Sequence, residues 1–185
     1  MSAFTSRPIL YAGTLLIALG ACTGVVEAPD EGSGTTTAAQ CSSQTFWKDK
    51  DMGSEFMHPG GKCNECHNKN TNTSAPNLFI AGTVYQTFHE PDECNGVNGD
   101  PVSEAGLNDV TVVITDGSGR SLPPVPVNRV GNFQYVDKVI PPFSVKVVKG
   151  GKENRMTMSP PHGDCNACHT QMGANDAPGR ITIPQ

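Results

Sequence analysis

Residues 107–115 read LNDVTVVIT and place Val110, Val112 and Ile114 on one face of an extended segment. Side chains two positions apart share a face of a strand, so this alternation predicts a half-buried strand. The Asp116-Gly117-Ser118-Gly119 stretch that follows favours a turn. Similar β-branched and aromatic composition recurs in residues 78–88, 125–130, 132–136, 143–148 and 180–183. Short strands at intervals of about ten residues predict a mainly β chain that folds as a β-sandwich. Any helix is expected to be a short turn that carries one of the two cysteine motifs described below.

The composition excludes several classes of protein. The chain has 185 residues, of which 17% are charged, and a formal net charge of −5. Because nucleic-acid binders are generally basic, we expect no nucleic-acid partner. The charged residues are too few for a coiled coil. No apolar run reaches the roughly 18 residues that a membrane-spanning helix needs. The length suits one domain with appendages.

Residues 1–21 read MSAFTSRPILYAGTLLIALGA, with Arg7 before a short apolar stretch, which is typical of an export signal. The Leu19-Gly20-Ala21-Cys22 ending resembles the bacterial lipoprotein box, which implies a lipid on Cys22. An ordinary signal peptide with an incidental cysteine is the alternative. Residues 22–40 have little bulky apolar content and are expected to be a lipidated flexible tether at a membrane surface. We expect export to the bacterial cell envelope, and Thr23 in place of Asp favours the outer membrane, on its periplasmic or outer face.

Two cysteine pairs lie in the same frame, Cys63-Asn64-Glu65-Cys66-His67 and Cys165-Asn166-Ala167-Cys168-His169. The C-x-x-C-H pattern is the attachment signature of c-type haem. Its two thiols add to the two vinyl groups of one porphyrin, and the histidine that follows can bind the iron. The sequence therefore predicts two covalently attached haem c groups. The predicted thioether residues are Cys63, Cys66, Cys165 and Cys168, and the predicted proximal iron ligands are His67 and His169.

Zinc is the main rival, because two C-x-x-C pairs can make a four-thiolate site. A histidine follows both pairs at the same offset, and 98 residues separate the pairs, far more than in a zinc ribbon. Both features favour haem. A thioredoxin-like redox site needs a βαβ context, and none is visible.

Cys41 and Cys94 remain once Cys22 and the four motif thiols are assigned. Two leftover cysteines in an oxidising compartment suggest one disulfide, although two unrelated free thiols are the alternative.

The sixth iron ligands stay open. His58 and His162 lie just upstream of the two motifs and are candidate distal ligands, each more easily reaching the neighbouring haem than its own. His89 is the next candidate, although a strand separates it from the first motif. The methionine candidates are Met52, Met57, Met156, Met158 and Met172. Two histidines on one iron would give a low potential, and a methionine would raise it.

Three stretches, Ile80–Val84, Ala105–Val112 and Val130–Tyr135, resemble the carboxypeptidase regulatory-like family, although Gly131-Asn132-Phe133 departs slightly from its turn. The resemblance covers residues 78–158 and implies an accessory Ig-like sandwich without peptidase activity. Taken whole, the chain is similar to small dihaem c-type cytochrome lipoproteins. It would then comprise a first haem segment (41–77), the sandwich (78–158), and a second haem segment with the final strand (159–185). In Ig-like folds this order places both haems at one end.

The predicted function is electron transfer, relaying single electrons between redox partners such as other cytochromes. A haem enzyme with an open iron, peroxidase-like, and a subunit of a polymeric haem chain are the alternatives. We therefore also consider a homo-oligomer.

Overall fold

The computed structural model describes residues 40–51, 53–68, 75–98 and 109–185. The predicted export signal, Cys22, Met52 and nearly all of the predicted tether lie outside these residues. Within them, no helix has the length and apolar character needed to cross a bilayer.

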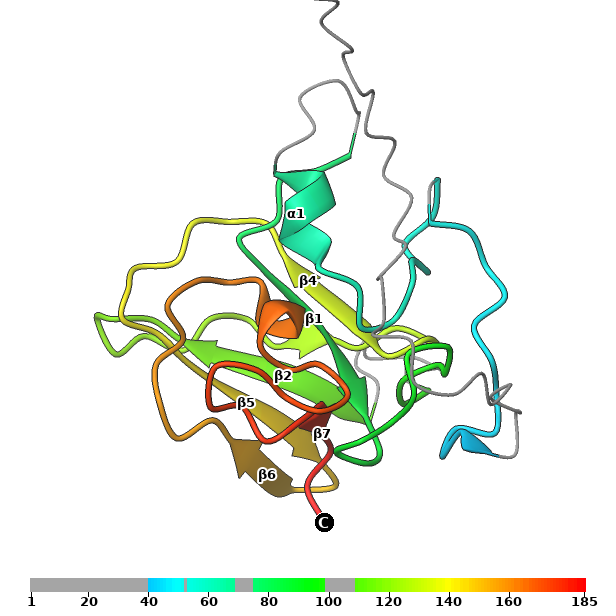
Figure 1. Ribbon diagram of the computed structural model, residues 1–185. Coiled ribbons are helices and arrows are strands. Elements are labelled where there is room, and N and C mark those ends of the chain that lie inside the picture. The colour runs from blue at the N-terminus through cyan, green and yellow to red at the C-terminus, as the bar shows by residue number, and fades with distance from the viewer. Residues whose placement is uncertain (1–39, 52, 69–74, 99–108) are drawn as a thin grey trace, which may run out of the picture.

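The described residues are mainly β and form two sheets, as the sequence predicts (Figure 1). One sheet has the order β4-β1-β7, with β1 at Ile80–Tyr85, β4 at Asn132–Tyr135 and β7 at Ile181–Thr182. The other has the order β3-β2-β5-β6. Its strands are β2 (Val110–Thr115), β3 (Val125–Pro126), β5 (Ser144–Lys149) and β6 (Lys152–Arg155).

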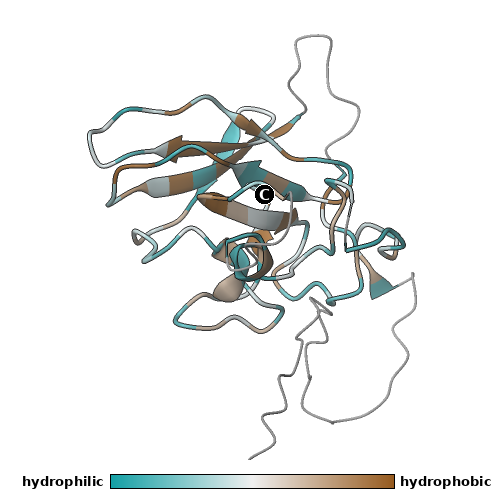
Figure 2. Cartoon of the chain, turned by 90° about the horizontal axis from the view of Figure 1, so that it is seen from above, coloured by the Kyte–Doolittle hydropathy of each residue, from teal (hydrophilic) through white to brown (hydrophobic). Residues whose placement is uncertain are grey.

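The core forms between the two sheets because each contributes one apolar face. Ile80, Val84 and Phe133 come from the first sheet, and Val112 and Ile114 from the second. In Figure 2 the apolar segments gather in the strands, whereas the loops are largely hydrophilic. β2 alternates buried and partly exposed residues, which confirms the half-buried strand predicted from its sequence.

The turn after β2 is organised by the buried side chain of Asp116. Its Oδ1 accepts hydrogen bonds from Ser118 N (2.9 Å), Ser118 Oγ (2.6 Å) and Arg120 N (3.1 Å). These bonds, led by the Ser118 hydroxyl, hold the pKa of Asp116 below its usual value. The predicted turn is thus an aspartate-capped loop.

Two strands differ from the prediction. The predicted strand over 125–130 is only Val125–Pro126, because Asn128 Oδ1 accepts from Val130 N and Asn132 N and turns the chain. β6 was not predicted, since its sequence Lys-Glu-Asn-Arg has no apolar alternation. It forms as an edge strand after Gly150-Gly151, with Glu153 paired to Lys146 across the hairpin.

Two short helices in the described ranges carry the two motifs. α1 spans Cys63–His67, and the 3₁₀ helix η2 spans Cys165–Ala167. This confirms the prediction that any helix is a short turn at a C-x-x-C-H motif.

β1 is buried along its whole length because the chain covers both of its faces and both of its edges. β4 pairs with it antiparallel, and β7 pairs with it parallel at Val84 and Tyr85. Ahead of β7, Asp164 forms a parallel bridge to Ala81, whose amide donates to the Gly163 carbonyl at 2.9 Å. The residues just before the second motif and the strand after it, β7, therefore both pair with β1, and the motif lies between them in the chain.

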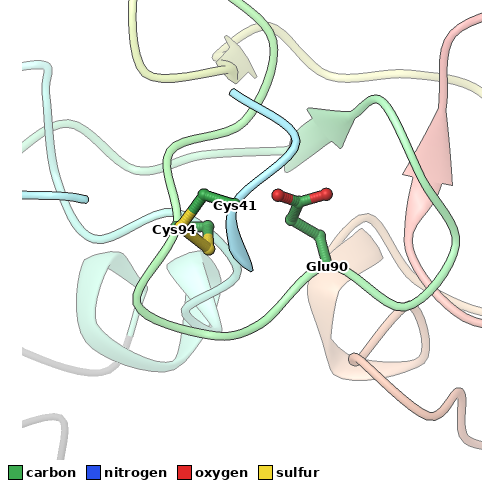
Figure 3. A group of neighbouring side chains, drawn as sticks. All are labelled: Cys41, Glu90 and Cys94. Atoms are coloured by element: carbon green, nitrogen blue, oxygen red, sulfur yellow. A yellow bond between two sulfur atoms is a disulfide. The ribbon is translucent and has the colours of Figure 1, made fainter. Parts of the chain in front are cut away.

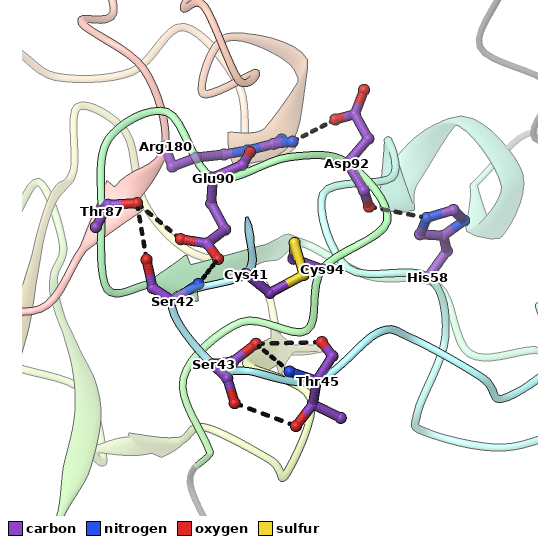
Figure 4. The surroundings of a disulfide bond; sticks show 10 residues. All are labelled: Cys41, Ser42, Ser43, Thr45, His58, Thr87, Glu90, Asp92, Cys94 and Arg180. Atoms are coloured by element: carbon purple, nitrogen blue, oxygen red, sulfur yellow. Dashed lines mark hydrogen bonds and ion pairs between the residues drawn. A yellow bond between two sulfur atoms is a disulfide. The ribbon is translucent and has the colours of Figure 1, made fainter. Parts of the chain in front are cut away.

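The predicted disulfide between Cys41 and Cys94 is confirmed, with Cα atoms 5.4 Å apart and a sequence separation of 53. Residues beside it pair as well, since Trp47 N donates to Glu93 O and Asn95 N to Thr45 O. Glu90 accepts from Ser42 N and from Thr87 Oγ1, as Figure 4 shows. The start of the described chain is thus fixed to the loop that follows β1.

Candidate functional site

Both motifs present their first cysteine in the same way. Cys63 Sγ lies 3.4 Å from the carbonyl oxygen of Gly61, and Cys165 Sγ lies 3.6 Å from that of Gly163. In each motif the partner is thus the residue two positions before the cysteine. The repeated sequence therefore folds into a repeated local structure.

The motif histidines are held by matching hydrogen bonds. His67 Nδ1 lies 2.9 Å from the carbonyl oxygen of Pro76, and His169 Nδ1 lies 2.8 Å from that of Gly179. A carbonyl oxygen only accepts, so each Nδ1 carries the proton and each Nε2 keeps its lone pair. Orientation of this kind, through the second ring nitrogen, is what metal-binding histidines usually show.

The two motifs lie against each other, although about a hundred residues separate them in sequence. Asn166, inside the second motif, donates from Nδ2 to the Gly61 carbonyl at 2.8 Å. The same nitrogen lies 3.9 Å from Cys63 Sγ. In the reverse direction, Asn64 N donates to Asp164 Oδ2 at 3.2 Å. The expectation that both motifs share one end of the sandwich agrees with these contacts.

Thr83 of β1 joins this contact to the sheet. Its amide donates to Asn166 Oδ1 at 3.0 Å, and its hydroxyl oxygen accepts from Asn166 Nδ2 at 3.1 Å. The hydroxyl oxygen also accepts a hydrogen bond from the Gly60 amide at 2.8 Å, and the hydroxyl donates to Asn132 Oδ1 at 2.7 Å. Thr83 and Asn166 are both almost fully buried. Thr83 thus anchors two segments to β1. One is the segment just before the first motif, and the other is the second motif itself.

Gly82, beside Thr83, lets the second motif approach the strand. A Cβ at this position would lie 2.9 Å from Cys165 Cβ and 2.9 Å from Phe133 Cζ. Cys165 and Phe133 therefore occupy the space that a side chain at position 82 would need.

The first cysteine of each motif does not have the properties of a redox-active thiol. Burial raises the pKa of the Cys63 thiol to about 12, and the Asp164 carboxylate adds to the rise. Burial also raises the pKa of Cys165, and the neighbouring Cys63 adds to it. Nucleophilic thiolates have lowered pKa values instead. This environment disfavours thiol–disulfide chemistry at either C-x-x-C pair.

The cysteines also lack the arrangement of a four-thiolate zinc site. Within the described part of the chain, only Cys41, Glu90 and Cys94 bring three potential ligand atoms within 4.8 Å of one another. Figure 3 shows this group, in which the two sulfurs are joined in the disulfide and do not offer thiolates. The motif cysteines, all within the described residues, form no such group. The geometry favours one separate site for each motif.

The candidate distal ligands lie in different surroundings. His58 stacks on Trp47 with ring centroids 4.3 Å apart, and its Nε2 lies 3.1 Å from the carbonyl oxygen of Asp92. His162 is exposed. His89 Nδ1 lies 2.8 Å from the Gln171 carbonyl, so His89 sits beside the second motif segment and not the first.

The methionine candidates differ as well. Met57 Sδ lies 3.4 Å from His67 Nε2. Met156 is partly exposed, and Met158 and Met172 expose 60% and 75% of their surface.

Three residues at the site were not predicted from the sequence: Thr83, Asn132 and Asn166. Asn166 carried a signal, because both motifs have asparagine directly after their first cysteine. The signal at Asn132 was weaker: it is the position at which this chain departs from the turn sequence of the carboxypeptidase regulatory-like family. Thr83 looked like any β-branched strand residue.

No family of proteins, no curated protein and no solved structure matches this chain. The resemblances drawn from its motifs therefore stay predictions.

The residues present fit a covalently bound haem at each motif. Each offers two cysteines and a histidine whose Nε2 lone pair is directed away from its backbone partner. Buried polar atoms without a partner among the described residues include Asn64 Oδ1 and Asp164 Oδ1, on the two segments that meet here. Unpartnered buried atoms are rare in proteins and are commonly explained by strain, a functional role, or a bound water or ion.

Proposed function

We propose that this protein is a dihaem c-type cytochrome that transfers single electrons between redox partners of the bacterial cell envelope. The observation that carries the proposal is the matched pair of C-x-x-C-H motifs, whose histidines are both oriented through Nδ1. Haem attached at each motif would supply a one-electron Fe(III)/Fe(II) couple.

The chain's own residues have three tasks in this function. Cys63, Cys66, Cys165 and Cys168 would anchor the two groups through thioether bonds. His67 and His169 would offer Nε2 as iron ligands, and the carbonyl oxygens of Pro76 and Gly179 fix their rings. Asn166 and Thr83 hold the two motifs together, so they would also hold the two attached groups near each other.

The partners in this proposal are other redox proteins, chiefly cytochromes. A chain of net charge −5, made more acidic by haem propionates, would attract a basic partner, with rates that fall as salt is added. Lipidated Cys22 would hold the domain at the membrane surface. Cys22→Ser should release the protein from the membrane fraction.

Intact mass tests the proposal. The full chain, expressed in bacteria that carry a c-type maturation system, should gain the mass of two haem groups. Cys63→Ala/Cys66→Ala and Cys165→Ala/Cys168→Ala should each lose one group. Cys41→Ser/Cys94→Ser is the matched control, since it also removes two cysteines and should keep both. A wild-type mass equal to the bare processed chain would overturn the proposal.

Ligand binding then separates a carrier from an enzyme. Two low-spin irons that bind neither cyanide nor CO support electron transfer alone. An iron that binds them in the wild-type protein and reduces peroxide would support the peroxidase-like alternative. A size by light scattering that grows with concentration would support the polymeric haem chain.

A further inference from the structure

We propose that the thioether sulfur of Met57 is the sixth ligand of the iron bound by His67. The inference rests on the proposed function and adds to it the axial ligation of the first haem. It assigns one member of the set of candidates that the sequence leaves open.

When His67 is neutral and protonated on Nδ1, its contact with Met57 joins two electron-pair donors. The Pro76 carbonyl fixes the proton of His67 on Nδ1, so Nε2 has a lone pair and no hydrogen. Met57 Sδ, 3.4 Å from Nε2, is itself only a weak acceptor. Two acceptors cannot form a hydrogen bond with each other. A metal ion between them would satisfy both lone pairs.

The opposite tautomer does not remove this conflict. With the proton on Nε2, the ring could donate weakly to the sulfur, but Nδ1 would then direct a lone pair at the Pro76 carbonyl oxygen 2.9 Å away. Either neutral tautomer of His67 thus leaves one contact between two acceptors. Iron at Nε2 resolves both contacts together.

The separation of the two atoms is close to what one metal needs. A metal–nitrogen bond of about 2.0 Å and a metal–sulfur bond of about 2.3 Å together span at most roughly 4.3 Å. Met57 Sδ would have to withdraw by up to about 1 Å, and an unbranched side chain with three rotatable bonds accommodates such a shift. Imidazole and thioether are also the axial pair found in many c-type cytochromes.

The backbone around Met57 is held in place before any ligand binds. Asn132 Nδ2 donates to the Met57 carbonyl at 2.6 Å, and Trp47 Nε1 donates to the Phe56 carbonyl at 2.9 Å. Three residues after Met57, Gly60 N donates to Thr83 Oγ1 at 2.8 Å. Because these three anchors come from different elements, Met57 is a preorganised ligand.

The neighbouring His58 is engaged elsewhere. Its ring stacks on Trp47, its Nε2 contacts the Asp92 carbonyl, and its Nδ1 lies 4.0 Å from Asp51 Oδ1. Successive side chains of an extended segment point in opposite directions, so one of the pair faces His67 and the other faces Trp47.

The second motif has no equivalent of Met57. Met57 precedes Cys63 by six residues, and the residue six before Cys165 is Ser159. Among the described residues, no side chain forms a hydrogen bond with His169 Nε2. The proposal therefore concerns the first haem alone, and a thioether ligand should give it a higher potential than two histidines would.

Met57→Ala and Met57→His test the assignment on the full matured protein. Met57→Ala should keep both haems by intact mass, lose the methionine–iron charge-transfer band, and bind one more CO per protein than the wild type. Met57→His should stay low-spin at that haem, with a lowered potential. Ile140→Ala, which shortens a half-exposed apolar side chain outside the set of candidate ligands, is the control and should change none of these.

A measurement on the wild-type protein avoids any dependence on how the variants fold. With methionine methyl groups isotopically labelled, the ε-methyl signal of Met57 should be shifted far upfield in the reduced protein, as expected for a methyl group above a porphyrin ring. An unshifted Met57 signal would overturn the assignment. So would unchanged spectra and CO binding in Met57→Ala, particularly if His58→Ala altered both. These failures leave two haems in the mass spectrum, whereas failure of the proposed function leaves none.

Discussion

Asn166 Nδ2 lies 2.8 Å from the carbonyl oxygen of Gly61, and this bond joins the two cysteine motifs across more than a hundred residues of chain. The same amide also bonds to Thr83 of β1 through both its oxygen and its nitrogen. One buried side chain therefore connects the two motifs to each other and to the sheet.

Asn166→Ala should destabilise the folded state by about 1–3 kcal/mol, because it leaves the buried amide of Thr83 without an acceptor. Asn64→Ala is the matched control at the equivalent position of the first motif, where the side-chain oxygen has no partner in the described structure. Its cost should be smaller. Urea unfolding of both variants measures the difference, and equal costs would contradict the bridging role of Asn166.

Gly82→Ala should lower stability by about 1–3 kcal/mol through overpacking, since the added methyl group would press on Cys165 and Phe133. Haem content at the second motif should fall, while that at the first stays unchanged. Peptide mass spectrometry after proteolysis reads each motif separately. Gly61→Ala is the control, because a Cβ there meets only the His58 carbonyl, at 3.3 Å. Equal loss from both motifs would count against a local effect at Gly82.

Cys41→Ser/Cys94→Ser should lower the free energy of unfolding by roughly 4 kcal/mol, the loop-closure contribution expected for a separation of 53 residues. Thermal unfolding under non-reducing conditions measures the effect. Adding a reductant to the wild type should reproduce the loss, and should leave the variant unaffected. A reductant effect of equal size in the variant would mean that the disulfide is not its source.

Asp116→Asn should destabilise the protein at neutral pH, and the difference from the wild type should shrink in acid. The carboxylate has a lowered pKa in the folded state, so its stabilising effect is present above the usual carboxyl pKa of about 4 and is lost as the pH falls through the folded value. Urea unfolding at pH 7, 5 and 3 measures it. Asp137→Asn, at an exposed residue, is the control. A difference that stays constant over this range would rule out the ionised Asp116 as its cause.

The strands were predictable from sequence where one face is apolar. β2 is the clearest case, because the alternation of Val110, Val112 and Ile114 reports directly which face is buried. β6 was missed because both faces of an edge hairpin strand can be polar, so Lys152–Arg155 carry no periodic signal. β3 was predicted too long because the turn that ends it depends on the Asn128 side chain bonding to backbone amides.

The motifs were recognisable because Cys63, Cys66 and His67 have the same spacing as Cys165, Cys168 and His169. The contacts between the motifs were not, since they depend on which residues two distant segments bring to β1. Asn132 illustrates this limit. Its side chain accepts from Thr83 and donates to the Met57 carbonyl, and no local pattern around residues 131–133 encodes either partner.

The disulfide has a consequence for the biogenesis of the protein. The covalent ring it closes, from Cys41 to Cys94, encloses Cys63 and Cys66. In the proposed dihaem cytochrome, Cys41 and Cys94 would have to be oxidised while Cys63 and Cys66 stay reduced until they add to the porphyrin. The proposal therefore requires that these four thiols be sorted correctly on a stretch of 54 residues, counting both ends from 41 to 94.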